Sequence, residues 1–161
     1  MHREAFEVCR RAEREGYDAV ILGTFGEPYL AEIRSLLGIP VVSMVEASLL
    51  LACSLAEQFA LVTLSPANVR RVGAVVKRHG LEGRITGILS LEAPVKEHEL
   101  NDALAGAKTG VVDAFRAVAE EAVAGGADAV IPAEGLFSEV MVAQGVKKIS
   151  EATVIDCVAA S

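Results

Sequence analysis

Short apolar runs alternate along the chain with longer segments in which apolar residues recur every three or four positions. The short runs, such as DAVILG and FALVTL, are typical of buried strands, and the longer segments are typical of amphipathic helices. Because a helix separates each strand from the next, the pattern predicts an α/β protein with parallel sheets and crossover helices. The predicted strands are 18–23, 40–44, 59–64, 84–90, 128–132 and 153–157, and the predicted helices are 2–15, 28–37, 46–57, 66–79, 97–124 and 136–144.

Two parts of the sequence repeat one another. The segment GYDAVI at 16–21 returns as GADAVI at 126–131, and VVSMVEAS at 41–48 returns as VIDCVAAS at 154–161. The repeat indicates two halves built on one βαβ pattern, and it predicts two pseudo-symmetric lobes. We expect residues 1–57 and 152–161 to form the first lobe and residues 58–151 to form the second.

Each copy of the repeat places one polar residue just after its strand, Thr24 in the first copy and Glu134 in the second. Ligands of open parallel sheets bind beyond the carboxyl ends of the strands, where helix N-termini offer unpaired N–H groups. Two lobes related by a pseudo-twofold axis would bring both residues to one cleft. Simpler roles stay open for both residues. The helix dipole would stabilise the negative charge of Glu134 beside the start of helix 136–144, and the hydroxyl of Thr24 would hydrogen-bond to nearby backbone.

The neighbours of these two residues are candidate substrate contacts. Gly26 and Gly135 would let the backbone approach a ligand closely, and Phe25 belongs to the same turn as Thr24. In the stretch VTLSPANV, Thr63 and Ser65 lie beside a helix start, which suits a substrate carboxylate or ring carbonyl. Ser65 would also serve as an ordinary N-cap.

The composition narrows the class of partner. A net charge of −7 without a stripe of Lys and Arg argues against a nucleic-acid binder, and small molecules or proteins remain. The longest apolar run, ASLLLAC, is far too short to span a membrane, and the chain begins with a charged amphipathic helix rather than a signal peptide.

The cysteines and histidines suggest little chemistry. Three scattered cysteines without metal-ligand spacing predict reduced thiols, a cytoplasmic location and no metal site. Cys9 and Cys53 lie in helical patterns and are expected to be small buried residues, whereas Cys157 follows a strand. We expect solvated, non-catalytic side chains at His2, His79 and His98, and an acid at a helix start at Glu27.

Several blocks in a fixed order resemble the aspartate/glutamate/hydantoin racemase superfamily, and its hydantoin racemase branch most. These blocks are GYDAVILGTFGEPYLAEIRSLLGIPVVSMVEA, VTLSP, GADAVIPAEGLF and VIDCVAAS, and together they cover nearly the whole chain. The resemblance implies flavodoxin-like lobes, no cofactor, a small carboxylate or hydantoin-like substrate and a homo-oligomer. It also implies a further strand before residue 1 and a helix after residue 161, so that the sequence is truncated at both ends relative to the family.

In that family each lobe carries a catalytic cysteine six residues after the acid that opens its strand. Counting from Asp18 and Asp128 gives Thr24 and Glu134 instead, which excludes the two-thiol mechanism. Glu134 is a competent base whose pKa would rise between two lobes, and Thr24 would donate a hydrogen bond to a developing enolate.

The leading hypothesis is therefore a cofactor-independent isomerase that acts at the carbon next to a carbonyl of a small amino acid, hydantoin or carboxylate. Glu134 would be its base and Thr24 the facing hydrogen-bond donor. The alternative is a non-catalytic carboxylate-binding protein derived from the racemase fold. A nucleotide-binding oxidoreductase is disfavoured, because no GxGxxG loop follows any predicted strand.

Overall fold

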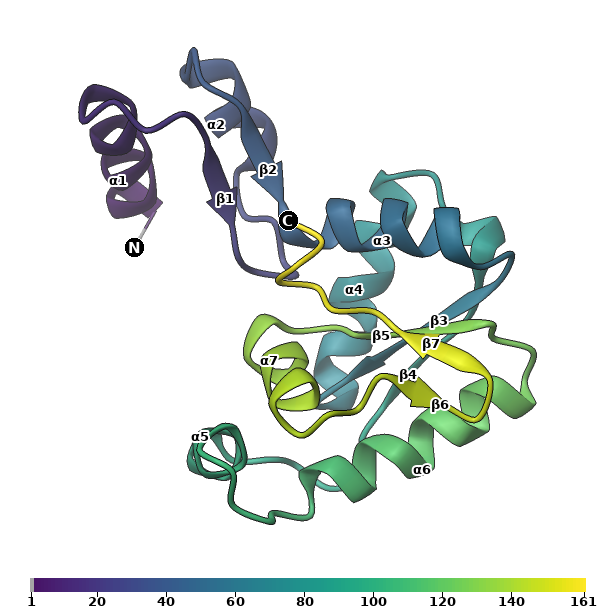
Figure 1. The fold of residues 1–161 in the computed structure, drawn as a ribbon. Helices are drawn as coiled ribbons and strands as arrows, with labels where there is room; N and C mark the ends of the chain where they lie inside the picture. Colours follow the sequence, from purple (N-terminus) through teal and green to yellow (C-terminus); the bar gives the residue numbers. More distant parts are fainter. Residues whose placement is uncertain (1) are drawn as a thin grey trace.

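The computed structural model describes residues 2–161, with side chains from residue 4 onward, and it divides the chain into a smaller and a larger part (Figure 1). The prediction for the side chain of His2 lies outside the described residues. The helices are α1 (His2–Arg14), α2 (Leu30–Leu36), α3 (Met44–Leu55), α4 (Pro66–Arg78), α5 (Glu97–Leu104), α6 (Val111–Ala124) and α7 (Gly135–Ala143), with a 3₁₀ turn at Glu82–Arg84. The strands are β1 (Val20–Leu22), β2 (Val41–Ser43), β3 (Phe59–Thr63), β4 (Ile85–Ser90), β5 (Ala129–Pro132), β6 (Lys148–Ile149) and β7 (Ala152–Val154).

The strands form two separate sheets. In the smaller part, β1 and β2 pair in parallel, and in the larger part five strands follow the order β4-β3-β5-β7-β6. All pairs of the larger sheet are parallel except β6 with β7, which is antiparallel. The predicted α/β class with parallel sheets and crossover helices is confirmed.

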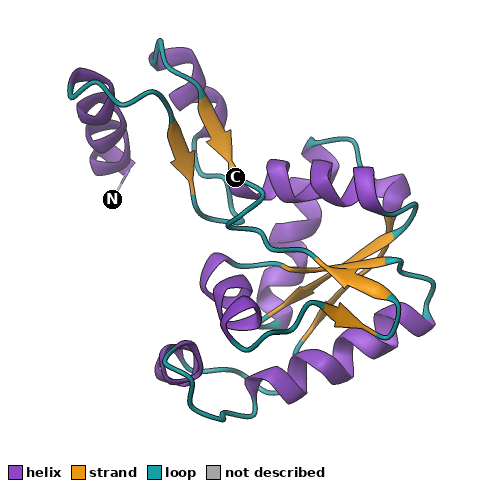
Figure 2. Ribbon diagram, viewed as in Figure 1, coloured by secondary structure: helices purple, strands orange, loops and turns teal. Residues whose placement is uncertain are grey.

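Helices cover both faces of the larger sheet (Figure 2). Along β3 and β5, side chains alternate between the two faces, as the period of a strand requires. One face packs against α3 and α4, and the other packs against α5, α6 and α7. The larger residues of the first core are Phe25, Val45, Leu49, Phe59, Leu61, Val72 and Ile131, and those of the second are Val62, Leu100, Phe115, Val130, Phe137 and Met141.

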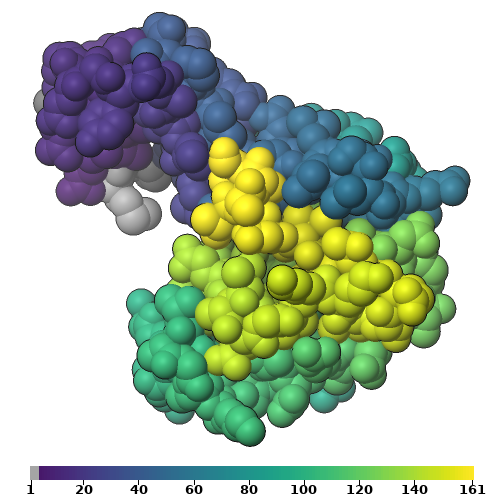
Figure 3. Space-filling view, viewed as in Figure 1, coloured from purple at the N-terminus to yellow at the C-terminus, as the bar shows by residue number. Residues whose placement is uncertain are grey.

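The smaller part has its own core on one side of its sheet. Side chains of α1 and α2 pack there against Val20, Leu22 and Val41. Ile21 lies between Val20 and Leu22 in β1, so it points to the opposite face, where it is 52% exposed. The space-filling view shows this part projecting from the larger body, with the C-terminal residues lying beside the junction (Figure 3).

Three details differ from the sequence prediction. The single helix expected at 97–124 is two helices, α5 and α6, because the chain turns at Gly106 with a φ of 94°, a left-handed conformation that ends a helix. The two-residue strand β6 was not predicted, since it is too short to show a period. The strand at 152–154, expected in the first lobe, is hydrogen-bonded to β5 in the larger sheet.

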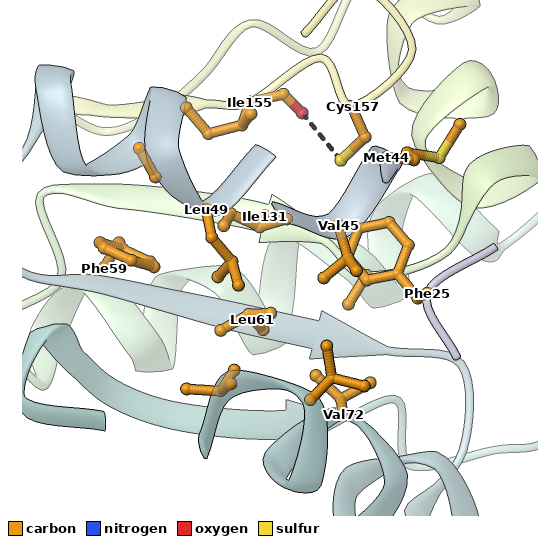
Figure 4. Close-up of a cluster of buried hydrophobic side chains, with 14 of the residues drawn as sticks. Phe25, Met44, Val45, Leu49, Phe59, Leu61, Val72, Ile131, Ile155 and Cys157 are labelled. Carbon is orange, nitrogen blue, oxygen red and sulfur yellow. Dashed lines mark hydrogen bonds between the residues drawn. The ribbon is translucent and has the colours of Figure 1, made fainter. Parts of the chain in front are cut away.

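The loop after β1 holds the two parts together through two buried side chains. Phe25 is 3% exposed and enters the first core of the larger part beside Val45 and Val72 (Figure 4). Glu27, two residues later, has a fully buried side chain. Because these residues come from the loop, while Val45, Val72 and Arg78 come from α3 and α4, the loop is fixed against the larger part.

Glu27 is held by a network of polar partners. Its carboxylate accepts hydrogen bonds from the hydroxyl of Ser43 and from Nη1 of Arg78 at 3.2 Å, and Nε2 of His79 lies 2.9 Å from both of its oxygens. His79 is only 13% exposed, so its prediction as a solvated histidine is wrong. The reason is that His79 follows the last turn of α4, directly against the buried carboxylate. Glu27 is likewise more than an acid at a helix start.

We expect His79→Ala to lower the free energy of unfolding by about 1.5–3 kcal/mol, because a buried carboxylate loses one of its hydrogen-bond partners. Chemical denaturation measures this loss. His98→Ala is the matched control, since His98 is exposed on α5, and it should leave the unfolding midpoint unchanged. Equal midpoints for the two variants would show that the His79 contact does not stabilise the fold.

Candidate active site

A cavity of about 470 Å³ lies where the loop after β1 meets the start of α7. β1 and β5 both end at this cavity, one from each sheet. Ligand sites of parallel α/β proteins commonly lie at such strand ends. The lining residues are Gly23, Thr24, Phe25, Gly26 and Pro28 from the loop, Arg71 from α4, and Glu134, Gly135 and Leu136 at the start of α7.

The cavity brings together five of the seven residues that the sequence analysis selected. Thr24 is exposed and Glu134 is half-buried, and they reach the cavity from the smaller and larger parts respectively. Gly26 and Gly135 line it as well. Phe25 also lines it, although most of its ring is buried in the core, so that it supports the loop beside the cavity.

Thr63 and Ser65 differ from the expectation. Thr63 is 0% exposed, and its hydroxyl donates hydrogen bonds to the carbonyls of Ser65 at 3.0 Å and Leu89 at 3.2 Å. Those backbone partners turn the hydroxyl toward the end of β4 rather than toward the cavity. Ser65 is the N-cap residue of α4 and is absent from the cavity lining. We therefore do not retain either residue as a substrate contact.

Gly135 is required by the close approach of the two parts. A Cβ at this position would lie 3.2 Å from the carbonyl oxygen of Gly23 and 3.5 Å from the sulfur of Met44. A side chain there would push the loop after β1 away from α7. The glycine therefore sets the distance between the two walls of the cavity that carry Thr24 and Glu134.

Glu134 has a local environment suited to proton transfer. It is the N-cap residue of α7, yet its side chain makes no capping hydrogen bond and instead accepts one from the amide nitrogen of Asn68. Burial raises the pKa of its carboxyl, while the nearby charge of Arg71 and the hydrogen bond from Asn68 lower it to a smaller extent. A raised pKa brings a carboxylate closer to the strength of a useful general base.

Two polar residues of this site were missed by the sequence analysis. Asn68 and Arg71 lie three positions apart on α4, and Nη2 of Arg71 donates a hydrogen bond of 2.8 Å to the amide oxygen of Asn68. The amide of Asn68 is thus fixed between Arg71 and Glu134. Their spacing places both on one face of a helix, which was the available signal.

The cysteines take no part in the cavity. Cys157 is fully buried, and burial raises the pKa of its thiol to about 11, so it stays protonated at neutral pH. Figure 4 shows the thiol directed to the carbonyl of Ile155. Cys9 is buried with a raised pKa, and Cys53 is partly buried. Among the side chains described, from residue 4 onward, no group of three or more His, Cys, Asp or Glu could hold a metal ion. No helix within residues 2–161 is long and apolar enough to cross a membrane.

The sequence and the fold are both similar to those of racemases. A family model described as Asp/Glu/Hydantoin racemase matches residues 2–161. A hydantoin racemase of Pseudomonas sp. (strain NS671) is 32% identical over 114 residues, which are 71% of this chain and 45% of that protein. The chain thus spans less than half the length of this relative.

Two solved structures share the fold over most of this chain. The allantoin racemase from Klebsiella pneumoniae has a TM-score of 0.81 and 24% identity, and the match covers 97% of this chain and 61% of that one. The allantoin racemase from Pseudomonas fluorescens has a TM-score of 0.70 and 26% identity, with 89% and 58% covered.

The raised pKa of Glu134 predicts a pH-dependent effect on stability. The folded protein binds a proton at this carboxyl more tightly than the unfolded chain does, so ionised Glu134 lowers stability at neutral pH. Glu134→Gln should therefore raise the free energy of unfolding at pH 7. The gain should vanish as the pH falls below the ordinary carboxyl pKa of 4.5, where both states are protonated.

Denaturant unfolding at a series of pH values measures this effect. Glu139→Gln makes the same change at an exposed position of α7 and should show no such gain. A Glu134→Gln variant that is less stable than the parent at pH 7 would contradict the assigned environment of the carboxyl.

Proposed function

Because the chain belongs to the Asp/Glu/hydantoin racemase family, we propose that it is a cofactor-independent isomerase acting at the carbon next to a carbonyl group of a small molecule. The observation that carries this proposal is that Thr24 and Glu134 line one cavity from opposite parts of the fold. The substrate would be an amino acid, a hydantoin or another small carboxylate.

Glu134 is the proposed base. Its carboxylate would take the proton from the carbon next to the carbonyl, and the electron pair of the broken C–H bond would move into the carbonyl to form an enolate. Asn68 holds one carboxylate oxygen, and within the described chain no hydrogen bond occupies the other. Positioned general bases of this kind contribute about 10²–10⁴-fold to a rate.

Thr24 is the proposed hydrogen-bond donor on the facing wall. Its hydroxyl is too weak an acid or base to move the proton itself, but it would stabilise the enolate oxygen. When the enolate collapses, Glu134 would return the proton to the same face of the carbon. Inversion of the centre would need water to deliver a proton to the opposite face. A single base on one face therefore favours proton exchange or a one-sided isomerisation over rapid racemisation.

A non-catalytic carboxylate binder is the second candidate. One observation favours it: of the described residues that line the cavity, Glu134 is the only one with a side chain that can act as a base. The resembled family uses two thiols, and here both corresponding positions hold other residues. The cytoplasmic location and the homo-oligomeric state expected from the sequence stay predictions.

Deuterium exchange separates the two candidates. In D₂O, ¹H NMR of a panel of amino acids and 5-substituted hydantoins should show loss of the proton next to the carbonyl in at least one compound. Glu134→Gln should slow this exchange about 100-fold or more, because the base is removed. Thr24→Val should slow it by a smaller factor.

Glu139→Gln serves as the control on the same helix and should exchange at the parent rate. Parent-rate exchange in Glu134→Gln would reject this residue as the base. Saturable binding of a panel member without exchange would support the binding protein instead.

A further inference from the structure

We propose that Arg71 recognises an anionic oxygen group of the ligand, so that the compound bound in this cavity carries a carboxylate apart from its reacting carbonyl. The inference rests on the proposed function in one respect: that function places the reacting carbon of the ligand beside Glu134. Recognition by Arg71 does not itself require turnover, which allows the two to be tested separately.

Arg71 stands out by its charge. Among the described residues that line the cavity it is the only cation, Glu134 is the only anion, and the others are apolar, glycine or threonine. The chain as a whole carries a net charge of −7, so a cation at a cavity wall is not a consequence of general composition. A local positive charge in such a cavity attracts and orients an anionic group.

The charge of Arg71 is not cancelled by Glu134. No direct ion pair joins the two side chains in the described part of the chain, and Asn68 lies between them, accepting from Arg71 and donating to Glu134. The bond to Asn68 is also the only hydrogen bond that the described chain gives to this guanidinium. Its remaining N–H groups form a planar fork that fits the two oxygens of a carboxylate.

The stem of Arg71 lies close to the loop after β1. Its Cδ lies 3.8 Å from the place that a Cβ on Gly26 would occupy. The methylene groups therefore pass close to Gly26, and Arg71 lines the cavity together with this loop and the start of α7. This gives the cavity a positive group on the wall that faces the loop after β1.

A carboxylate suits this site better than a phosphate. The cavity holds one arginine, and a dianion would stand close to the carboxylate of Glu134, where like charges repel. The volume of about 470 Å³ fits a compound of the size of a substituted hydantoin or a small dicarboxylate.

A pair of probes that differ only in charge tests the inference. Hydantoin-5-acetate and its amide, hydantoin-5-acetamide, have nearly the same shape. Isothermal titration calorimetry should show that the parent protein binds the acid about 10- to 100-fold more tightly, because the acid offers a charge-assisted pair to Arg71. Arg71→Gln should remove this preference and leave the affinity for the amide within about twofold.

Arg70→Gln is the matched control, because Arg70 is an exposed neighbour on α4 that does not line the cavity. It should keep the preference for the acid. A parent protein that does not bind the acid, or does not prefer it, overturns the inference. So does a preference that survives in Arg71→Gln, or one that falls equally in Arg70→Gln.

The outcome is separable from that of the proposed function. A preference that depends on Arg71 without deuterium exchange would support the anion site and reject the isomerase. Deuterium exchange that depends on Glu134, without any preference for the acid, would support the isomerase and reject the anion site. Circular dichroism of Arg71→Gln should match the parent protein, since Arg71 is exposed and outside both cores.

Discussion

The burial of Phe25 and Glu27 is the constraint on which the cavity depends. Both side chains belong to the loop after β1, and both are buried: Phe25 lies in the first core of the larger part, and Glu27 lies against Ser43, Arg78 and His79. The same loop holds Glu27 and Tyr29 at φ values of 45° and 61°, a left-handed conformation that costs about 1–2 kcal/mol per residue. Enclosing an aromatic ring contributes about 1.5–3 kcal/mol in return, and the partners of Glu27 stabilise its charge. The strained loop thus keeps Thr24 at the cavity that Glu134 also lines.

Much of this arrangement follows from local pattern. The strands and most helices were predicted because apolar periodicity is a property of consecutive residues, and the repeat placed Thr24 and Glu134 at equivalent strand ends. The predictions that were wrong concern features that depend on packing or on backbone conformation. Whether Thr63 faces the cavity or the end of β4 depends on backbone partners that the sequence does not show. Gly106 ends a helix only because its backbone turns left-handed there.

The polar network behind the site depends on long-range contacts as well. Asn68 and Arg71 are ordinary residues of an amphipathic helix until the rotation of α4 turns them toward α7. His79 resembles many surface histidines, and its role follows from a carboxylate that lies 52 positions earlier in the chain. Such residues become visible only when the two parts of the fold are placed against each other.

The chain of contacts from Arg71 through Asn68 to Glu134 has a thermodynamic consequence. Arg71 opposes the effect of burial on the carboxyl, so a partner that neutralises the guanidinium would leave desolvation less opposed and increase the proton affinity of Glu134. Anion uptake and proton uptake are then two legs of one cycle, and each must strengthen the other by the same factor. Binding of an anion in the cavity would therefore make Glu134 a stronger base through electrostatics alone, and no movement of the backbone would be needed.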